Sequence, residues 1–95
     1  MIKLLRLVSG EELLAIVTEE TDTHVSIKEP LIMVPTGEGK IGVADYMPYS
    51  DITKGVTISR THIMFILNAV EQMQNAHKER FSAIVTPSSN LVGIK

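Results

Sequence analysis

The positions of apolar and polar residues predict three β-strands in the first part of the chain, over residues 2–8, 12–18 and 24–28. In the second segment Leu13, Ala15 and Val17 share one face and Leu14 and Ile16 share the other, and in the third Val25 and Ile27 face one way. Polar turn signals at 9–11 and 19–23 separate the three segments. We therefore expect three short antiparallel strands joined by tight connections.

A longer pair of extended segments follows. Pro30 interrupts the third strand, because proline cannot donate a hydrogen bond to the neighbouring strand. The extended pattern then resumes, turns at 35–40 and returns over 41–49, where Pro48 weakens it. The pattern predicts a hairpin arm over residues 31–49.

The last two extended segments, 56–60 and 63–67, are joined by only two residues, Thr61 and His62. The first of them alternates, whereas the second is apolar at every position. A strand with one exposed face would alternate, so both faces of this segment need a cover. A following helix covers one face at most. The other face either meets a partner copy of the chain or, in a monomer, lies at the buried centre of the sheet.

The period becomes helical after residue 67. Asn68 and Glu71 have the spacing of a capping box with Asn68 as the N-cap, and a helix is predicted over about 69–81. Its apolar residues, which we expect to cover the open end of the sheet, are Val70, Met73 and Phe81, with His77 on the same stripe. A further short strand is expected at 91–94.

These elements predict a single mainly β domain over residues 1–95. Its body, residues 1–67, is expected to form a strongly bent five-stranded antiparallel sheet, or a small open barrel, that carries the hairpin arm. Residues 68–95 add the C-terminal helix and a tail.

Composition excludes several classes of protein. The chain has 95 residues, no cysteine and a formal net charge of -2. These values exclude a disulfide scaffold and cysteine-ligated metal sites, and they argue against a protein that coats nucleic acid through bulk phosphate contacts. No stretch approaches transmembrane length, and the N-terminal segment meets polar residues too early for a signal peptide. We expect a cytoplasmic protein without membrane contact. A core this small favours burial against a partner copy.

Other patterns do not indicate catalysis. Residues 37–42 match G-x-G-x-x-G, but a strand rather than a helix follows, so a hairpin turn explains the match better than a dinucleotide site. His24, His62 and His77 match no compact metal motif. The sequence has neither a defined carboxylate pair nor a nucleophile elbow. We expect no enzyme activity, no cofactor and no metal.

The segment DTHVSI, residues 22–27, resembles a motif of the Sm and LSm proteins and their bacterial relative Hfq. In that family the motif ends in Asp-x-His-x-Asn at the turn into the third strand. Asp22 and His24 match it, whereas Ser26 stands in the place of the asparagine.

The segment ISRTHIMFI, residues 58–66, resembles the family's second motif, which carries Arg-Gly, or Lys-His in the bacterial branch, between the last two strands. Arg60 matches the arginine, and Thr61 replaces the glycine. The resemblance covers residues 2–28 and 55–67. It does not extend to the helix, which precedes the first strand in the family and follows the last strand here.

The resemblance implies a fold, an assembly and a ligand. The family has a bent five-stranded sheet and forms rings, here expected to hold five to seven copies, in which the fourth strand of one copy pairs with the fifth of the next. Such rings bind single-stranded, often uridine-rich RNA at the pore. His24 and Arg60 would then stack on the two sides of a base, and Ser26 would offer it a hydrogen bond. The residues implied at the RNA site are His24, Ser26, Arg60, Thr61 and His62. Those implied at the subunit interface are Val56, Ile58, Ile63, Met64, Phe65 and Ile66.

Two other functions stay open. Ser26, Thr61 and the acidic balance favour a structural or adaptor homo-oligomer that keeps the ring without an RNA site. Tyr46 and Tyr49 favour a barrel that binds a small ligand or a protein partner through its arm, because aromatic side chains at a strand tip bind bases or partners.

Overall fold

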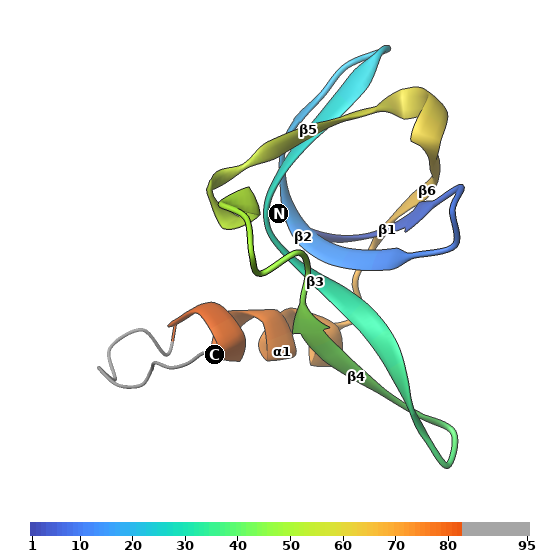
Figure 1. Ribbon diagram of the computed structural model, residues 1–95, viewed down its shortest axis with the longest axis vertical. Coiled ribbons are helices and arrows are strands. Elements are labelled where there is room, and N and C mark those ends of the chain that lie inside the picture. Colours follow the sequence, from blue (N-terminus) through green and yellow to red (C-terminus); the bar gives the residue numbers. More distant parts are fainter. Residues whose placement is uncertain (83–95) are drawn as a thin grey trace.

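The chain folds into an open, strongly bent antiparallel sheet with one helix packed on it, in a computed structural model that describes residues 1–82 (Figure 1). The strand expected at 91–94 lies outside the described residues. The strands are β1 (Ile2–Leu7), β2 (Glu12–Glu20), β3 (His24–Gly37), β4 (Lys40–Asp45), β5 (Val56–Ser59) and β6 (Ile63–Asn68). Two short 3-10 helices, η1 (Ile52–Lys54) and η2 (Arg60–His62), flank β5, and the helix α1 spans Glu71–Ser82.

The sheet has six strands and two free ends. Its order is β4-β3-β2-β1-β6, and β5 pairs with the first half of β3 while β4 pairs with the second half. β5 and β6 are neighbours along the chain, but they lie at opposite ends of the sheet and are joined through η2. The barrel is therefore open between β5 and β6. The prediction of a mainly β fold with a C-terminal helix is confirmed.

The expected interruption at Pro30 is wrong, because β3 continues through it as one strand of 14 residues. The register between β2 and β3 shifts between Leu14 and Ile16, where β3 has one residue more than β2. The additional residue forms a β-bulge, and Glu29 there has a φ of 53°. A bulge tolerates proline because the ladder hydrogen bond is already missing. The bend at this point lets the two halves of β3 pair with different strands.

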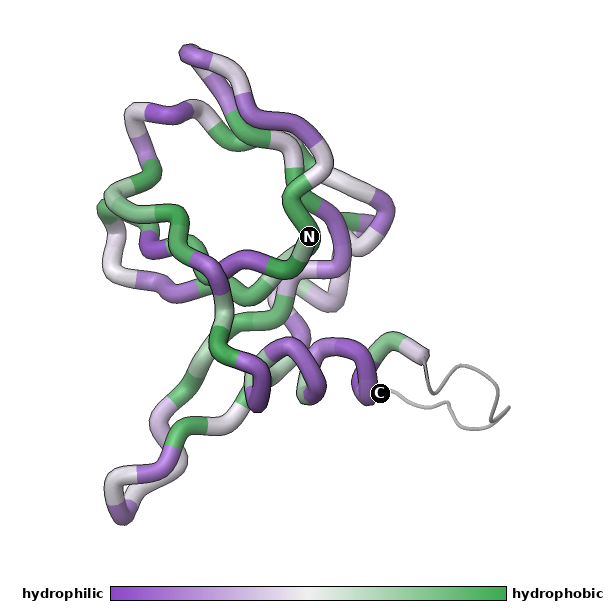
Figure 2. Tube along the Cα trace, turned by 180° about the vertical axis from the view of Figure 1, so that it is seen from behind, coloured by the Kyte–Doolittle hydropathy of each residue, from purple (hydrophilic) through white to green (hydrophobic). Residues whose placement is uncertain are grey.

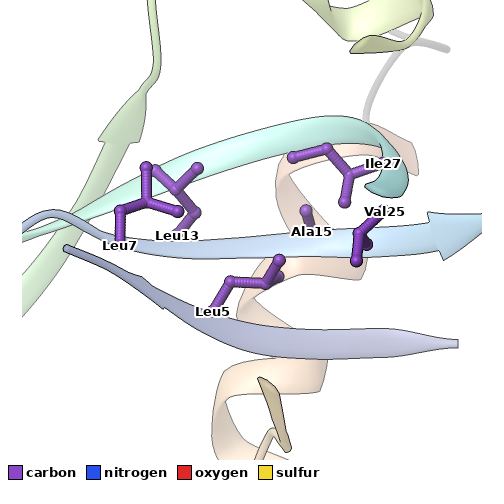
Figure 3. Close-up of a cluster of buried hydrophobic side chains, with 6 residues drawn as sticks. All are labelled: Leu5, Leu7, Leu13, Ala15, Val25 and Ile27. Carbon is purple, nitrogen blue, oxygen red and sulfur yellow. The ribbon is translucent and has the colours of Figure 1, made fainter. Parts of the chain in front are cut away.

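The main core lies on the concave side of the bent sheet. Alternate side chains of β1, β2 and β3 meet there (Figure 3), and the six that form the buried cluster are Leu5, Leu7, Leu13, Ala15, Val25 and Ile27. Each is at most 8% exposed. The prediction that Leu13 shares a face with Ala15, and Val25 with Ile27, is therefore confirmed.

The helix α1 packs on the convex side of the sheet, and not on the open end of the barrel where it was expected. Met73 and Phe81 contact a second buried cluster around Leu14 and Leu31. His77 is 2% exposed, and its Nε2 donates a hydrogen bond of 2.8 Å to the Glu29 carbonyl at the β-bulge. Figure 2 shows hydrophilic residues along most of this helix. The contacts of Met73, His77 and Phe81 therefore hold the helix on the sheet.

The start of α1 also differs from the prediction. Asn68 is the last residue of β6, and its Oδ1 accepts a hydrogen bond from Lys3 Nζ at 2.7 Å. The helix begins at Glu71, and the Val70 carbonyl accepts the first bonds, from the amides of Met73 and Gln74. The capping-box prediction is therefore wrong. Val70, expected in the buried stripe, is 66% exposed.

Candidate functional site

The pairing of β3 with β5 brings the two sequence motifs together. His24 lies opposite Ser59 in this pair, and the backbone amide of Arg60 donates to the Thr23 carbonyl at 2.9 Å. The backbones of residues that are more than thirty positions apart in the sequence thus meet where β5 ends and η2 begins. We call His24, Ser26 and Arg60 the motif cluster.

The imidazole of His24 has partners at both ring nitrogens. Its Nδ1 lies 3.2 Å from the Thr21 hydroxyl and 3.1 Å from the Thr23 hydroxyl, and its Nε2 lies 3.5 Å from a carboxylate oxygen of Glu19. A ring that carries a proton on Nε2 satisfies this arrangement, with Nδ1 accepting from a hydroxyl. These contacts at both ring nitrogens restrict the orientation of the ring.

Ser26 lies on the same face of β3 as His24. Val25 and Ile27 point into the main core, so the residues that alternate with them are on the convex side. The Ser26 hydroxyl lies 3.0 Å from the hydroxyl of Thr57 on β5. This hydroxyl therefore already has a partner, and it retains acceptor capacity for a second one.

The guanidinium of Arg60 turns toward the other face of the sheet. Its Nη1 lies 3.5 Å from a carboxylate oxygen of Glu20, and Glu20 lies opposite the buried Val25. Directly opposed residues of an antiparallel pair share a face, so Glu20 belongs to the concave side. Arg60 and Glu20 line a cavity of about 330 Å³ together with residues 63–66 of β6.

Thr61 and His62 lie in η2 together with Arg60, where a two-residue turn was expected. The Thr61 hydroxyl lies 2.9 Å from the Ser59 hydroxyl, beside the motif cluster. The backbone carbonyl of His62 accepts from the Val8 amide at 2.9 Å. The structure therefore brings Thr61 close to the motif cluster and directs His62 toward the turn after β1.

Carboxylates at the end of β2 are part of the site, and sequence reasoning treated them only as a polar loop. Glu19 and Glu20 contact the two nitrogen-bearing side chains of the motif cluster, and Asp22 lies in the same hairpin. Two carboxylates thus lie 3.5 Å from nitrogen atoms of the motif cluster and offset the positive charge of Arg60. The run of acidic residues just before the first motif was the available signal.

The free edges of the sheet carry the residues expected at a subunit interface. β6 pairs with β1 alone and β5 with β3 alone among the described strands. Met64 and Phe65 are each 52% exposed and Leu67 is 55% exposed. The monomeric interpretation of 63–67 as the buried centre of the sheet is therefore wrong, because β6 is an edge strand.

The other four expected interface residues are turned inward. Val56 and Ile58 on β5, like Ile63 and Ile66 on β6, are partly buried and pack against the main core. They line the two margins of the opening in the barrel.

The tyrosines lie beyond the end of β4 rather than at the tip of the arm. The Tyr46 hydroxyl donates to the Glu11 carboxylate at 3.2 Å. Burial raises the pKa of the Tyr46 phenol, and the Glu11 carboxylate raises it further. Tyr46 and His62 line a mostly apolar cavity of about 310 Å³ at the mouth of the barrel, whereas Tyr49 is 78% exposed.

Within residues 1–82, no group of three or more His, Cys, Asp or Glu side chains is arranged to hold a metal ion, and no helix is long and apolar enough to cross a membrane. No protein-family model matches the chain, and no curated protein matches it.

Proposed function

We propose that this chain is an Sm-like protein that assembles into a homo-oligomeric ring and binds single-stranded, uridine-rich RNA at the pore. One observation carries the proposal: the two segments that resemble Sm motifs meet at the junction of β5 and η2. That junction lies beside the opening between the two free edges of the sheet. A ligand site and an assembly surface thus adjoin each other.

The free edges support the assembly. Unpaired strand edges with exposed apolar side chains favour pairing with another chain, and β6 has both properties. Pairing of β6 from one copy with β5 of the next is a head-to-tail contact, which closes into a ring when the rotation between copies permits. Five to seven copies are proposed. Each copy would continue the bent sheet of its neighbour and cover the opening of its barrel.

The motif cluster supports the proposal that the ligand is single-stranded RNA. Proteins that read single strands stack splayed bases on flat side chains such as histidine and arginine. Contacts at both ring nitrogens restrict the orientation of His24, and Ser26 offers an acceptor on the same face. A ring repeats the cluster once per copy, so weak single contacts add up through avidity.

The proposal is tested by measuring mass and RNA binding on one sample. Light scattering should give a multiple of the 10.5 kDa chain mass, and a short oligouridine should bind at low salt. Arg60→Ala should weaken RNA binding by at least about fivefold, which corresponds to the loss of one stacking contact, without changing the mass. Arg80→Ala is the matched control. It removes an arginine of α1 that pairs with Asp45 at the end of β4, and this variant should bind RNA like the wild type. A monomeric mass would contradict the assembly.

A structural or adaptor ring without RNA binding is the second candidate, because of the carboxylates around the motif cluster. Glu19 and Glu20 occupy the positions nearest to His24 and Arg60, where they repel phosphate. A multimeric mass together with no binding of any single-stranded RNA at low salt would favour this function over the first.

A further inference from the structure

Both nitrogen-bearing groups of the motif cluster are already paired with acidic side chains. Arg60 Nη1 lies 3.5 Å from Glu20, and His24 Nε2 lies 3.5 Å from Glu19. We infer that Glu19 and Glu20 exclude phosphate groups from the site, so that it takes up the bases of a single strand and leaves the backbone outside. This inference rests on the proposed function and specifies which part of the ligand the site selects.

The charges and positions of Glu19 and Glu20 explain why the site would take up a base and not a phosphate. A phosphate that approaches Arg60 competes with the Glu20 carboxylate for the same guanidinium, and one that approaches His24 is repelled by the Glu19 carboxylate. A base is uncharged, so it meets no such repulsion. His24 contacts Glu19 and Thr23 through its two ring nitrogens, whereas a base stacks on the face of such a ring.

Glu20 also determines where the guanidinium is held. It draws Arg60 to the concave side, whereas His24 lies on the convex side. For both side chains to stack on one base, Arg60 has to leave Glu20. The Glu20 carboxylate thus acts against both a phosphate contact and a stacking contact of Arg60.

The salt dependence of binding measures this exclusion. For a single strand, each neutralised phosphate contributes a slope of about −0.7 to log K against log salt. A site whose arginine contacts Glu20 or a base, and no phosphate, neutralises no phosphate, so its affinity should change little with salt. One new phosphate contact for each occupied site would weaken binding by about threefold between about 50 and 200 mM salt.

The decisive experiment compares oligouridine binding by the wild type and Glu20→Gln over that salt range. Glutamine keeps the size of the side chain but removes the charge, and a half-exposed ion pair contributes little to stability, so the fold and the mass should not change. We expect Glu20→Gln to bind at least about threefold more tightly at low salt, with a slope steeper by about 0.7 for each occupied site. Glu19→Gln is a second variant, and it should also bind oligouridine more tightly than the wild type at low salt.

Glu79→Gln is the matched control, because it makes the same charge change on the exposed side of α1. It should behave like the wild type. A wild type that binds with a slope equal to that of Glu20→Gln would overturn the inference and leave RNA binding intact. Binding by Glu20→Gln alone would support exclusion by the carboxylate and contradict RNA binding by the native protein. No binding by either would overturn both.

Discussion

Tyr46 shows how one side chain at the mouth of the barrel depends on its surroundings. Its ring packs against the main core, and its hydroxyl donates to Glu11 at 3.2 Å. The same Glu11 carboxylate accepts a hydrogen bond from Ser9. Ionisation of the phenol would place a second negative charge beside Glu11 in a partly buried position. The pKa of Tyr46 is therefore raised above the ordinary value of about 10.

This raised pKa predicts a loss of stability at high pH. The folded chain holds the Tyr46 proton more tightly than the unfolded chain, so the stabilisation is complete below about pH 10 and is lost as the pH rises through the raised pKa. Urea unfolding of the wild type and Tyr46→Phe at several pH values from about 8 to 11 checks this. The decrease in unfolding free energy should be smaller in Tyr46→Phe. Tyr49→Phe, at a position 78% exposed, should show the same pH dependence of stability as the wild type. Equal pH dependence in all three proteins would contradict the raised pKa of Tyr46.

At the scale of elements, β6 presents an apolar strand edge with no partner among the described strands. It is an edge strand with three apolar side chains more than half exposed, namely Met64, Phe65 and Leu67. Edge strands of soluble monomers are usually protected by charges, prolines or short length. β6 has no charged residue between Ile63 and Asn68, which favours a partner strand at this edge.

Phe65→Glu tests the role of β6. A carboxylate at this half-exposed position costs the isolated chain little, but it has to be desolvated when a second chain covers the strand. We expect monomers or insoluble protein, measured by light scattering alongside circular dichroism. Ile41→Glu, at a 59% exposed position on the arm, is the control and should keep the assembly. Soluble Phe65→Glu protein with an unchanged mass would place the interface elsewhere.

At the scale of the whole molecule, two small cores lie on opposite sides of one sheet. The main core fills the concave side, and the second cluster lies under α1. A chain of this length buries a modest share of its surface and is marginal as an isolated domain. Assembly through the free edges would therefore contribute to folding stability as well as to shape.

Coupling between assembly and folding predicts that stability depends on concentration. Because association favours the folded chain by mass action, the midpoint of thermal unfolding should rise between about 1 and 100 µM protein. Phe65→Glu, if it stays soluble, should unfold at a midpoint that does not change with concentration. Differential scanning fluorimetry at several concentrations checks both proteins, and a constant midpoint for the wild type would contradict coupled assembly.

The elements were predictable where local pattern decides them. Leu13 and Ala15 were predicted to share one face of β2 and Leu14 the other, and they lie in different cores, because successive side chains of a strand point to opposite faces. Asn68 and Pro30 were interpreted wrongly. Asn68 has the sequence context of an N-cap, yet it extends β6 and bonds to Lys3. Pro30 is accommodated by a bulge that only the register with β2 produces.

The candidate site was likewise predictable from the sequence only in part. His24, Ser26 and Arg60 were chosen from two motifs, and the pairing of β3 with β5 places those motifs side by side. Which carboxylates accompany them could not be read from the pattern, because Glu20 meets Arg60 across forty residues of chain.

The local residue pattern and turn chemistry were thus enough to predict strands, a helix and which residues of a strand share a face, since these depend on neighbours within a few positions. The position of β6 at an open edge and the negative surroundings of Arg60 came from the folded arrangement alone. Strand order and ion pairing depend on contacts between distant segments, and a bulge or a bend in one strand changes them without altering the local pattern.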